Sequence, residues 1–155
     1  MKTRNGFVSN SSSSSFIVIE NHNDANYIKN LRKAYTGTPL IVDYQFGHTE
    51  FGWGPDEFSD VGTKIIFAYL QYLYVKDNHP EWLVMLEKVI TDNLEVTSIE
   101  WKIDLEYHEN GDFAYIDHQS NSADGENTDM FNGEDYLARF LFNSKSNITL
   151  DNDNY

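Results

Sequence analysis

An apolar segment between residues 58 and 76 constrains the fold more than any other part of the sequence. Built as a helix, it places apolar side chains around nearly its whole circumference. These are Val61, Ile65, Ile66, Phe67, Tyr69, Leu70, Tyr72, Leu73 and Val75. A helix that is apolar on all sides is typically buried. We therefore expect a central helix covered by the rest of the chain. Its longest apolar run, 65–75, is too short for the roughly 18 residues of a membrane span.

The patterns around this helix predict one compact α+β domain. A mixed or antiparallel sheet with a β-hairpin should pack against the central helix, with two to three further helices. Runs at 16–20 and 40–44 flank a helix that Asp24 can cap and that ends near Ala34, which fits a βαβ crossover or an α+β arrangement. Further elements are expected as a helix from Pro80, strands at 100–107 and 113–118, a helix at 134–142 and an edge strand at 146–150. We expect irregular loops at 47–57 and 119–135, a partly ordered Ser-rich segment at 1–15, the domain proper at 16–150 and an acidic tail at 151–155.

The hairpin expected at 100–118 carries the sharpest charge pattern. Apolar and charged residues alternate before Asn110-Gly111, a pair typical of two-residue hairpin turns. That turn would place Asp104 opposite Asp117, and like charges in facing positions are destabilising. The pattern indicates either a solvated sheet face or a surface that receives a cation or a basic partner. The residues of this candidate surface are Glu100, Asp104, Glu106, Glu109 and Asp117.

The charge balance limits the classes of partner. The net charge is −14, and residues 95–155 hold 14 acidic against 3 basic residues. Such a surface repels nucleic acids and anionic membranes and attracts basic patches on proteins. We therefore expect a protein partner with a basic patch, with no direct nucleic-acid binding and no membrane binding. The chain has no cysteine and no recognisable signal peptide, which fits the cytoplasm.

Three stretches carry a resemblance to a known group. They are Arg4 to Phe16, with its Gly-Phe-Val-Ser-Asn opening and serine run, Thr49 to Gly54, and Phe140 to Asn143 with Asn152 to Asn154. Together they resemble a family of small accessory proteins of T4-like bacteriophages whose function is unknown. The resemblance implies a setting in the host bacterial cytoplasm and supplies no activity.

Two alternatives to a binding protein remain. The first is a metal-dependent enzyme, such as a hydrolase, that uses His48 and Glu50 with one or more of His108, Asp117 and His118, because zinc and manganese accept such ligands. The second is a minor virion component. The chain shows no catalytic-triad elbow, His-Glu-x-x-His motif or dinucleotide fingerprint. We therefore favour a non-enzymatic protein without a cofactor, which binds and modulates a host protein.

Overall fold

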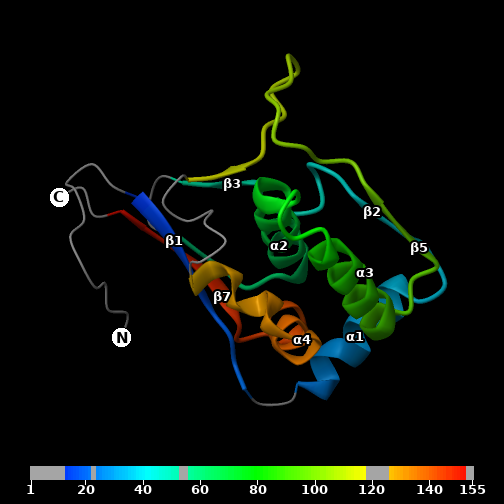
Figure 1. Ribbon diagram of the computed structural model, residues 1–155. Helices are drawn as coiled ribbons and strands as arrows, with labels where there is room; N and C mark the ends of the chain where they lie inside the picture. Colours follow the sequence, from blue (N-terminus) through cyan, green and yellow to red (C-terminus); the bar gives the residue numbers. More distant parts are fainter. Residues whose placement is uncertain (1–12, 22–23, 53–55, 118–125, 153–155) are drawn as a thin grey trace.

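Figure 1 shows a computed structural model that describes residues 13–21, 24–52, 56–117 and 126–152 of the chain. The helices are α1 (Ala25–Tyr35), α2 (Val61–Val75), α3 (Glu81–Leu94) and α4 (Glu134–Phe142), with the 3₁₀ helix η1 (Glu126–Asn132). The strands are β1 (Ser13–Val18), β2 (Pro39–Val42), β3 (Glu50–Phe51), β4 (Asp56–Phe58), β5 (Ser98–Trp101), β6 (Tyr115–Ile116) and β7 (Asn147–Asn152). They form one α+β domain, which confirms the predicted fold class.

Helix α2 lies at the centre, as its apolar circumference predicts. It begins after Asp60, whose carboxylate Oδ2 accepts hydrogen bonds from the backbone N of Thr63 at 2.9 Å and from its Oγ1 at 2.8 Å. This capping satisfies helix donors that have no partner within the helix. The side chains of Ile65, Ile66 and Phe67 have no exposed surface. Helices α3 and α4 and strand β6 all contact α2, which lies in the middle of the molecule (Figure 1).

In the part of the chain that the structure describes, seven short strands form three small sheets. Strands β1, β7 and β4 make an antiparallel sheet, while β2–β5 and β3–β6 are parallel pairs. Because β1 and β2 belong to different sheets, the segment between them is not a βαβ crossover. The prediction of an edge strand at 146–150 is wrong in position, since β7 lies between β1 and β4. The backbone groups of β7 are therefore hydrogen-bonded to a neighbouring strand on each side.

Two segments expected as irregular loops contain regular structure. The Gly-rich segment 47–57 includes β3 and the start of β4, and Phe51 at the end of β3 is fully buried. In the polar segment 119–135, η1 buries Met130 and Phe131. The ring of Phe131 stacks on Trp82 of α3, with centroids 4.4 Å apart and planes at 3°. The glycine content of the first segment and the polar composition of the second predict loops. A few apolar side chains are nevertheless enough to anchor such short elements to the core.

The expected segments at both ends enter the antiparallel sheet. Strand β1 begins at Ser13, within the serine run, and β7 continues to Asn152. Residues 1–12 and 153–155 lie outside the described residues, as does the candidate ligand His118. Among the helices of the described residues, none combines the length and apolar character required to cross a membrane.

Candidate functional site

Residues 102–114, which connect β5 to β6, project from the body at the top of Figure 1, and we call them the acidic arm. The predicted hairpin is wrong here. In the described segment 98–117, β5 pairs in parallel with β2 and β6 pairs in parallel with β3. Asp104 therefore does not face Asp117 across a ladder, and Tyr115 on the returning side pairs with Glu50 of β3. The chain does reverse at this position, but not through the predicted two-residue turn. The N–H of Gly111, which has a φ of 95°, donates to the carbonyl O of His108 at 2.9 Å, so Glu109 and Asn110 are the central residues of the turn.

Side-chain bonds to the local backbone replace the expected ladder. Asp104 Oδ1 accepts from the backbone N of Glu106 at 2.9 Å, and Asn110 Oδ1 accepts from the N of Asp112 at 3.0 Å. Such short-range bonds offer the backbone an alternative to sheet pairing. The N–H of His108 also donates to the carbonyl O of Asp112 at 3.0 Å, which closes the tip of the arm. The arm is thus shaped by its own polar side chains.

Two residues of the β2–β3 connection anchor the base of the arm. The Tyr44 hydroxyl accepts a hydrogen bond from the backbone N of Asp104 at 3.2 Å and donates to its carbonyl O at 3.3 Å. Thr49 Oγ1 donates to the carbonyl O of Phe113 at 2.8 Å on the returning side. Ile103 is buried in the core beside these contacts. The arm is consequently held at both of its ends.

The carboxylate of Asp104 interacts with two other residues of the arm. The hydrogen bond from the backbone of Glu106 is the main cause that lowers the pKa of this carboxyl, and His108 Nε2, 3.0 Å from Oδ1, acts in the same direction. Partial burial opposes both effects. Asp104 also lines a polar hollow of about 430 Å³ beside the arm. The other lining residues are Tyr44, Trp101, Lys102, Ile103, His108, Asn110 and Asp112.

The structure separates the five predicted acidic residues into two groups. Asp104, Glu106 and Glu109 are exposed on the arm. Glu100 lies on β5, where its carboxylate is 3.7 Å from Lys102 Nζ. Asp117 follows β6 and is half-buried, with its backbone N donating to the carbonyl O of Phe51 at 2.8 Å. The five acidic residues therefore lie on the arm itself or at the strands that flank it, and they do not share one face of a sheet.

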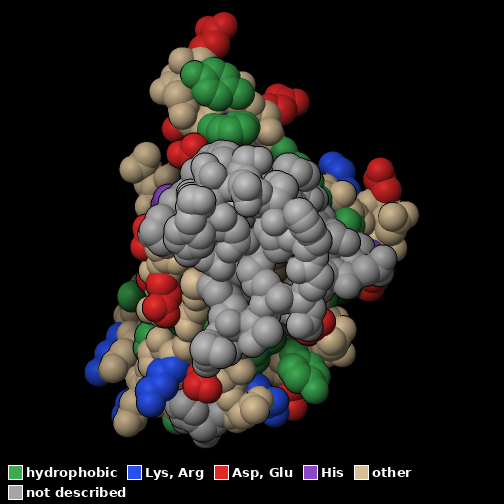
Figure 2. All heavy atoms as spheres, turned by 90° about the vertical axis from the view of Figure 1, so that its left-hand side faces the viewer, with side chains coloured by type: hydrophobic (Ala, Val, Ile, Leu, Met, Phe, Trp, Pro, Cys, Tyr) green, Lys and Arg blue, Asp and Glu red, His purple; other side chains and the backbone are tan. Residues whose placement is uncertain are grey.

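The sequence interpretation missed the aromatic residues of the arm. The side chain of Tyr107 is 70% exposed, and its ring lies 5.9 Å from that of Phe113. Phe113 in turn stacks on Tyr115, with centroids 5.2 Å apart. We call these three residues the aromatic strip. In Figure 2, apolar and acidic side chains are mixed on the projection at the top of the molecule. The alternation of Tyr107 with acidic neighbours was the available signal, and it was taken as strand periodicity.

The two proposed metal-ligating histidines that the structure describes, His48 and His108, make contacts with other residues. The ring of His48 stacks on Phe58 with centroids 4.3 Å apart, and its Nε2 bonds the carbonyl O of Glu50. The Nε2 of His108 lies 3.0 Å from Oδ1 of Asp104, within the arm. Within the described part of the chain, no group of three or more His, Asp or Glu residues could hold a metal ion.

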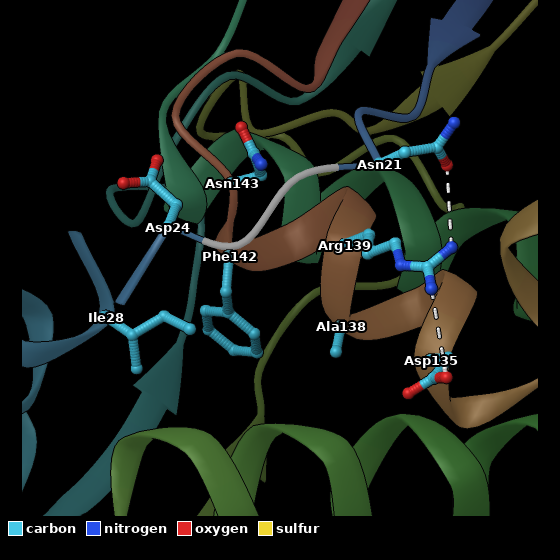
Figure 3. Close-up of a pocket in the computed structure, with 8 residues that line it drawn as sticks. All are labelled: Asn21, Asp24, Ile28, Asp135, Ala138, Arg139, Phe142 and Asn143. Carbon is cyan, nitrogen blue, oxygen red and sulfur yellow. Dashed lines mark hydrogen bonds and ion pairs between the residues drawn. The ribbon is translucent and has the colours of Figure 1, made fainter. Parts of the chain in front are cut away.

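A second hollow, of about 260 Å³, lies between α1 and α4 (Figure 3). Its charged groups already have protein partners. Asp24 Oδ2 accepts from Ser144 N at 2.9 Å and from Ser144 Oγ at 2.7 Å, and makes no capping bond to α1. The guanidinium of Arg139 lies 3.5 Å from Asn21 Oδ1 and 3.9 Å from Asp135 Oδ2 (Figure 3). We attribute this hollow to packing between the helices, because Asp24 and Arg139 at its edge already contact neighbouring residues.

No protein-family model, curated protein or solved structure matches the chain significantly. These comparisons supply no evidence on the function.

Proposed function

We propose that this protein is a non-enzymatic binding protein that attaches through its acidic arm to a basic patch on another protein. One observation carries the proposal. Between Lys102 and Arg139 the sequence has ten Asp or Glu residues and no Lys or Arg, and the arm projects the first four of these acids from the body. A surface of a single charge sign attracts its opposite over long range and accelerates association.

The construction of the arm supports binding over mere solubility. Solvated charges need no fixed backbone, whereas Tyr44 and Thr49 hold the two sides of the arm by hydrogen bonds. A surface held in its bound shape loses less conformational entropy when the partner arrives. In the setting that the phage resemblance implies, the partner is a host protein in the bacterial cytoplasm, and binding modulates it.

Capture from a bacterial lysate by immobilised protein tests this function. The variant expected to lose binding, which we call the arm variant, is Glu106→Lys/Glu109→Lys, because both side chains are exposed on the arm. Asp104 and Asp117 are left intact, since the first shapes the arm and the second is half-buried. The matched control is Glu57→Lys/Asp77→Lys, which changes the net charge equally at exposed positions outside the arm.

We expect a captured protein with a basic surface that the arm variant loses and the control variant retains. Its affinity should fall as salt rises from about 0.01 to 0.15 M, because the Debye length shrinks from about 30 to about 8 Å. Equal capture by both variants, or an affinity that does not change with salt, would contradict binding through the arm.

A further inference from the structure

The aromatic strip adds a selectivity that charge alone does not provide. We infer that the arm recognises arginine side chains in a basic segment of its partner, in preference to lysine. This inference rests on the proposed function and specifies the chemistry of the partner. It concerns the exposed ring of Tyr107 and the half-exposed ring of Phe113, which stacks on Tyr115.

Acidic residues are near neighbours of these rings along the chain. Tyr107 lies between Glu106 and Glu109 in the chain, and all three side chains are exposed. Across the turn, Asp112 directly precedes Phe113. A cation that settles on a ring face of the arm therefore has carboxylates within one or two residues along the chain. Charge complementarity thus points to a basic occupant, and the aromatic rings favour a planar group that can stack on them.

Arginine fits this combination better than lysine. Its guanidinium is planar, weakly hydrated and able to stack on an aromatic face while it donates two parallel hydrogen bonds to a carboxylate. The ammonium of lysine is compact and strongly hydrated, so it gains less from the ring. The molecule contains an example of this pairing, since the guanidinium carbon of Arg139 lies 5.7 Å from the centroid of the Tyr136 ring.

The partner segment should also be extended or mobile. The arm is a narrow projection, and its ring surface and its carboxylates lie along a few consecutive residues on each side of the turn. A flexible basic segment can lie along such a projection and place successive side chains on rings and carboxylates. Long-range attraction would guide the first encounter, and stacking would lengthen the bound state.

Two labelled peptides of equal length and charge test the inference, one carrying arginines and the other lysines at the same positions. Binding is measured by fluorescence anisotropy at constant salt. A cation–π contact at an exposed site contributes a factor of about two to five in affinity, and lysine gains only part of it, so two contacts predict that the arginine peptide binds several-fold tighter. Tyr107→Ala should reduce this preference to the part that the Phe113 ring supplies, and Tyr107→Phe should keep it because the ring remains.

The exposed Tyr136 on α4 provides the matched control, and Tyr136→Ala should leave the preference unchanged. Equal binding of both peptides, with loss of both in Glu106→Lys/Glu109→Lys, would overturn the arginine inference while the proposed function stands. Binding of neither peptide, or binding that the arm variant does not weaken, would overturn the inference and the proposed function together.

Discussion

Lys64 Nζ donates a hydrogen bond to the backbone carbonyl O of Asn143 at 2.7 Å, in a position with no exposed surface. It also donates to the carbonyl O of Ser146 at 3.1 Å. The amine thus connects the central helix α2 to the turn between α4 and β7. Ser146 Oγ reinforces this turn, since it accepts from the N of Glu20 at 2.9 Å and donates to the carbonyl O of Arg139. A buried lysine is therefore a structural link between helix and sheet.

Lys64 should make the stability of the protein rise with pH. Burial lowers the pKa of its amine from 10.5 to about 8, although Asp60 and Asp24 oppose this shift. Between these two values the unfolded chain binds more protons than the folded one, so the free energy of unfolding increases with pH. We expect a gain of about 2 kcal/mol from pH 8 to pH 10, measured by urea unfolding.

The control variants separate this effect from other titrations. Lys64→Met should lose the rise, whereas Lys88→Met, at an exposed position on α3, should keep it. Burial raises the pKa of Tyr27 and Tyr69 from 10.0, so the folded state favours their neutral forms and their contribution is lost only above about pH 10. A rise of equal size in Lys64→Met would assign the pH dependence to other groups.

Tyr44→Phe should loosen the acidic arm without unfolding the protein. The substitution removes the hydroxyl that bonds both the N and the carbonyl O of Asp104. Loss of such hydrogen bonds near solvent costs about 1 kcal/mol. Hydrogen exchange should show faster exchange of the Asp104 amide, while Tyr136→Phe, at an exposed ring, should leave it unchanged. Unaltered exchange in Tyr44→Phe would mean that Thr49 and the core contacts hold the arm alone.

Gly62→Ala should destabilise the protein although alanine favours helices. Helix propensity alone favours Ala over Gly by about 1 kcal/mol. A Cβ at this position, however, would lie 2.2 Å from the backbone carbonyl O of Phe46, which cannot move as a side chain can. Overpacking of this kind costs about 1–3 kcal/mol. We expect a lower midpoint in denaturant unfolding than for the wild type, and a higher midpoint would show that the 46–48 backbone yields.

Phe131→Ala should be among the most damaging substitutions in the part of the chain that reads as a polar loop. Its ring covers one face of Trp82, and His79 stacks on Trp82 with centroids 4.2 Å apart. Removing a buried Phe side chain costs about 3–5 kcal/mol. Phe113→Ala, at a half-exposed position on the arm, should cost clearly less. Similar losses of stability in thermal unfolding would show that η1 is not part of the core.

The elements that sequence predicts best are those with local signals. The range 134–142 coincides with α4, because an apolar stripe and acidic first-turn residues mark that helix. Helix α2 was recognised by its apolar circumference, but the same pattern could not reveal that Lys64 is buried, since a lysine in a helix ordinarily reaches solvent.

Pairing between distant strands left no comparable signal. Strands β3 and β6 have two residues each, which is too short for a period of two to be visible. In the candidate site, a chain reversal near Asn110-Gly111 was predicted correctly, but the two-residue turn was not. The strand register was also wrong, because Asp104 bonds its own neighbours and the two sides of the arm join different partner strands.

The position of β7 between β1 and β4 has a consequence for how the protein is made. Strand β1 pairs with residues more than a hundred positions later in the chain, since Ser13 faces Asn152 and Val18 faces Asn147. On the ribosome, β1 and β4 therefore emerge long before the strand that joins them. The helices and the β2–β5 pair can form first, and the antiparallel sheet must wait. Until β7 is released, β1 presents an unpaired edge to any chaperone or neighbouring chain.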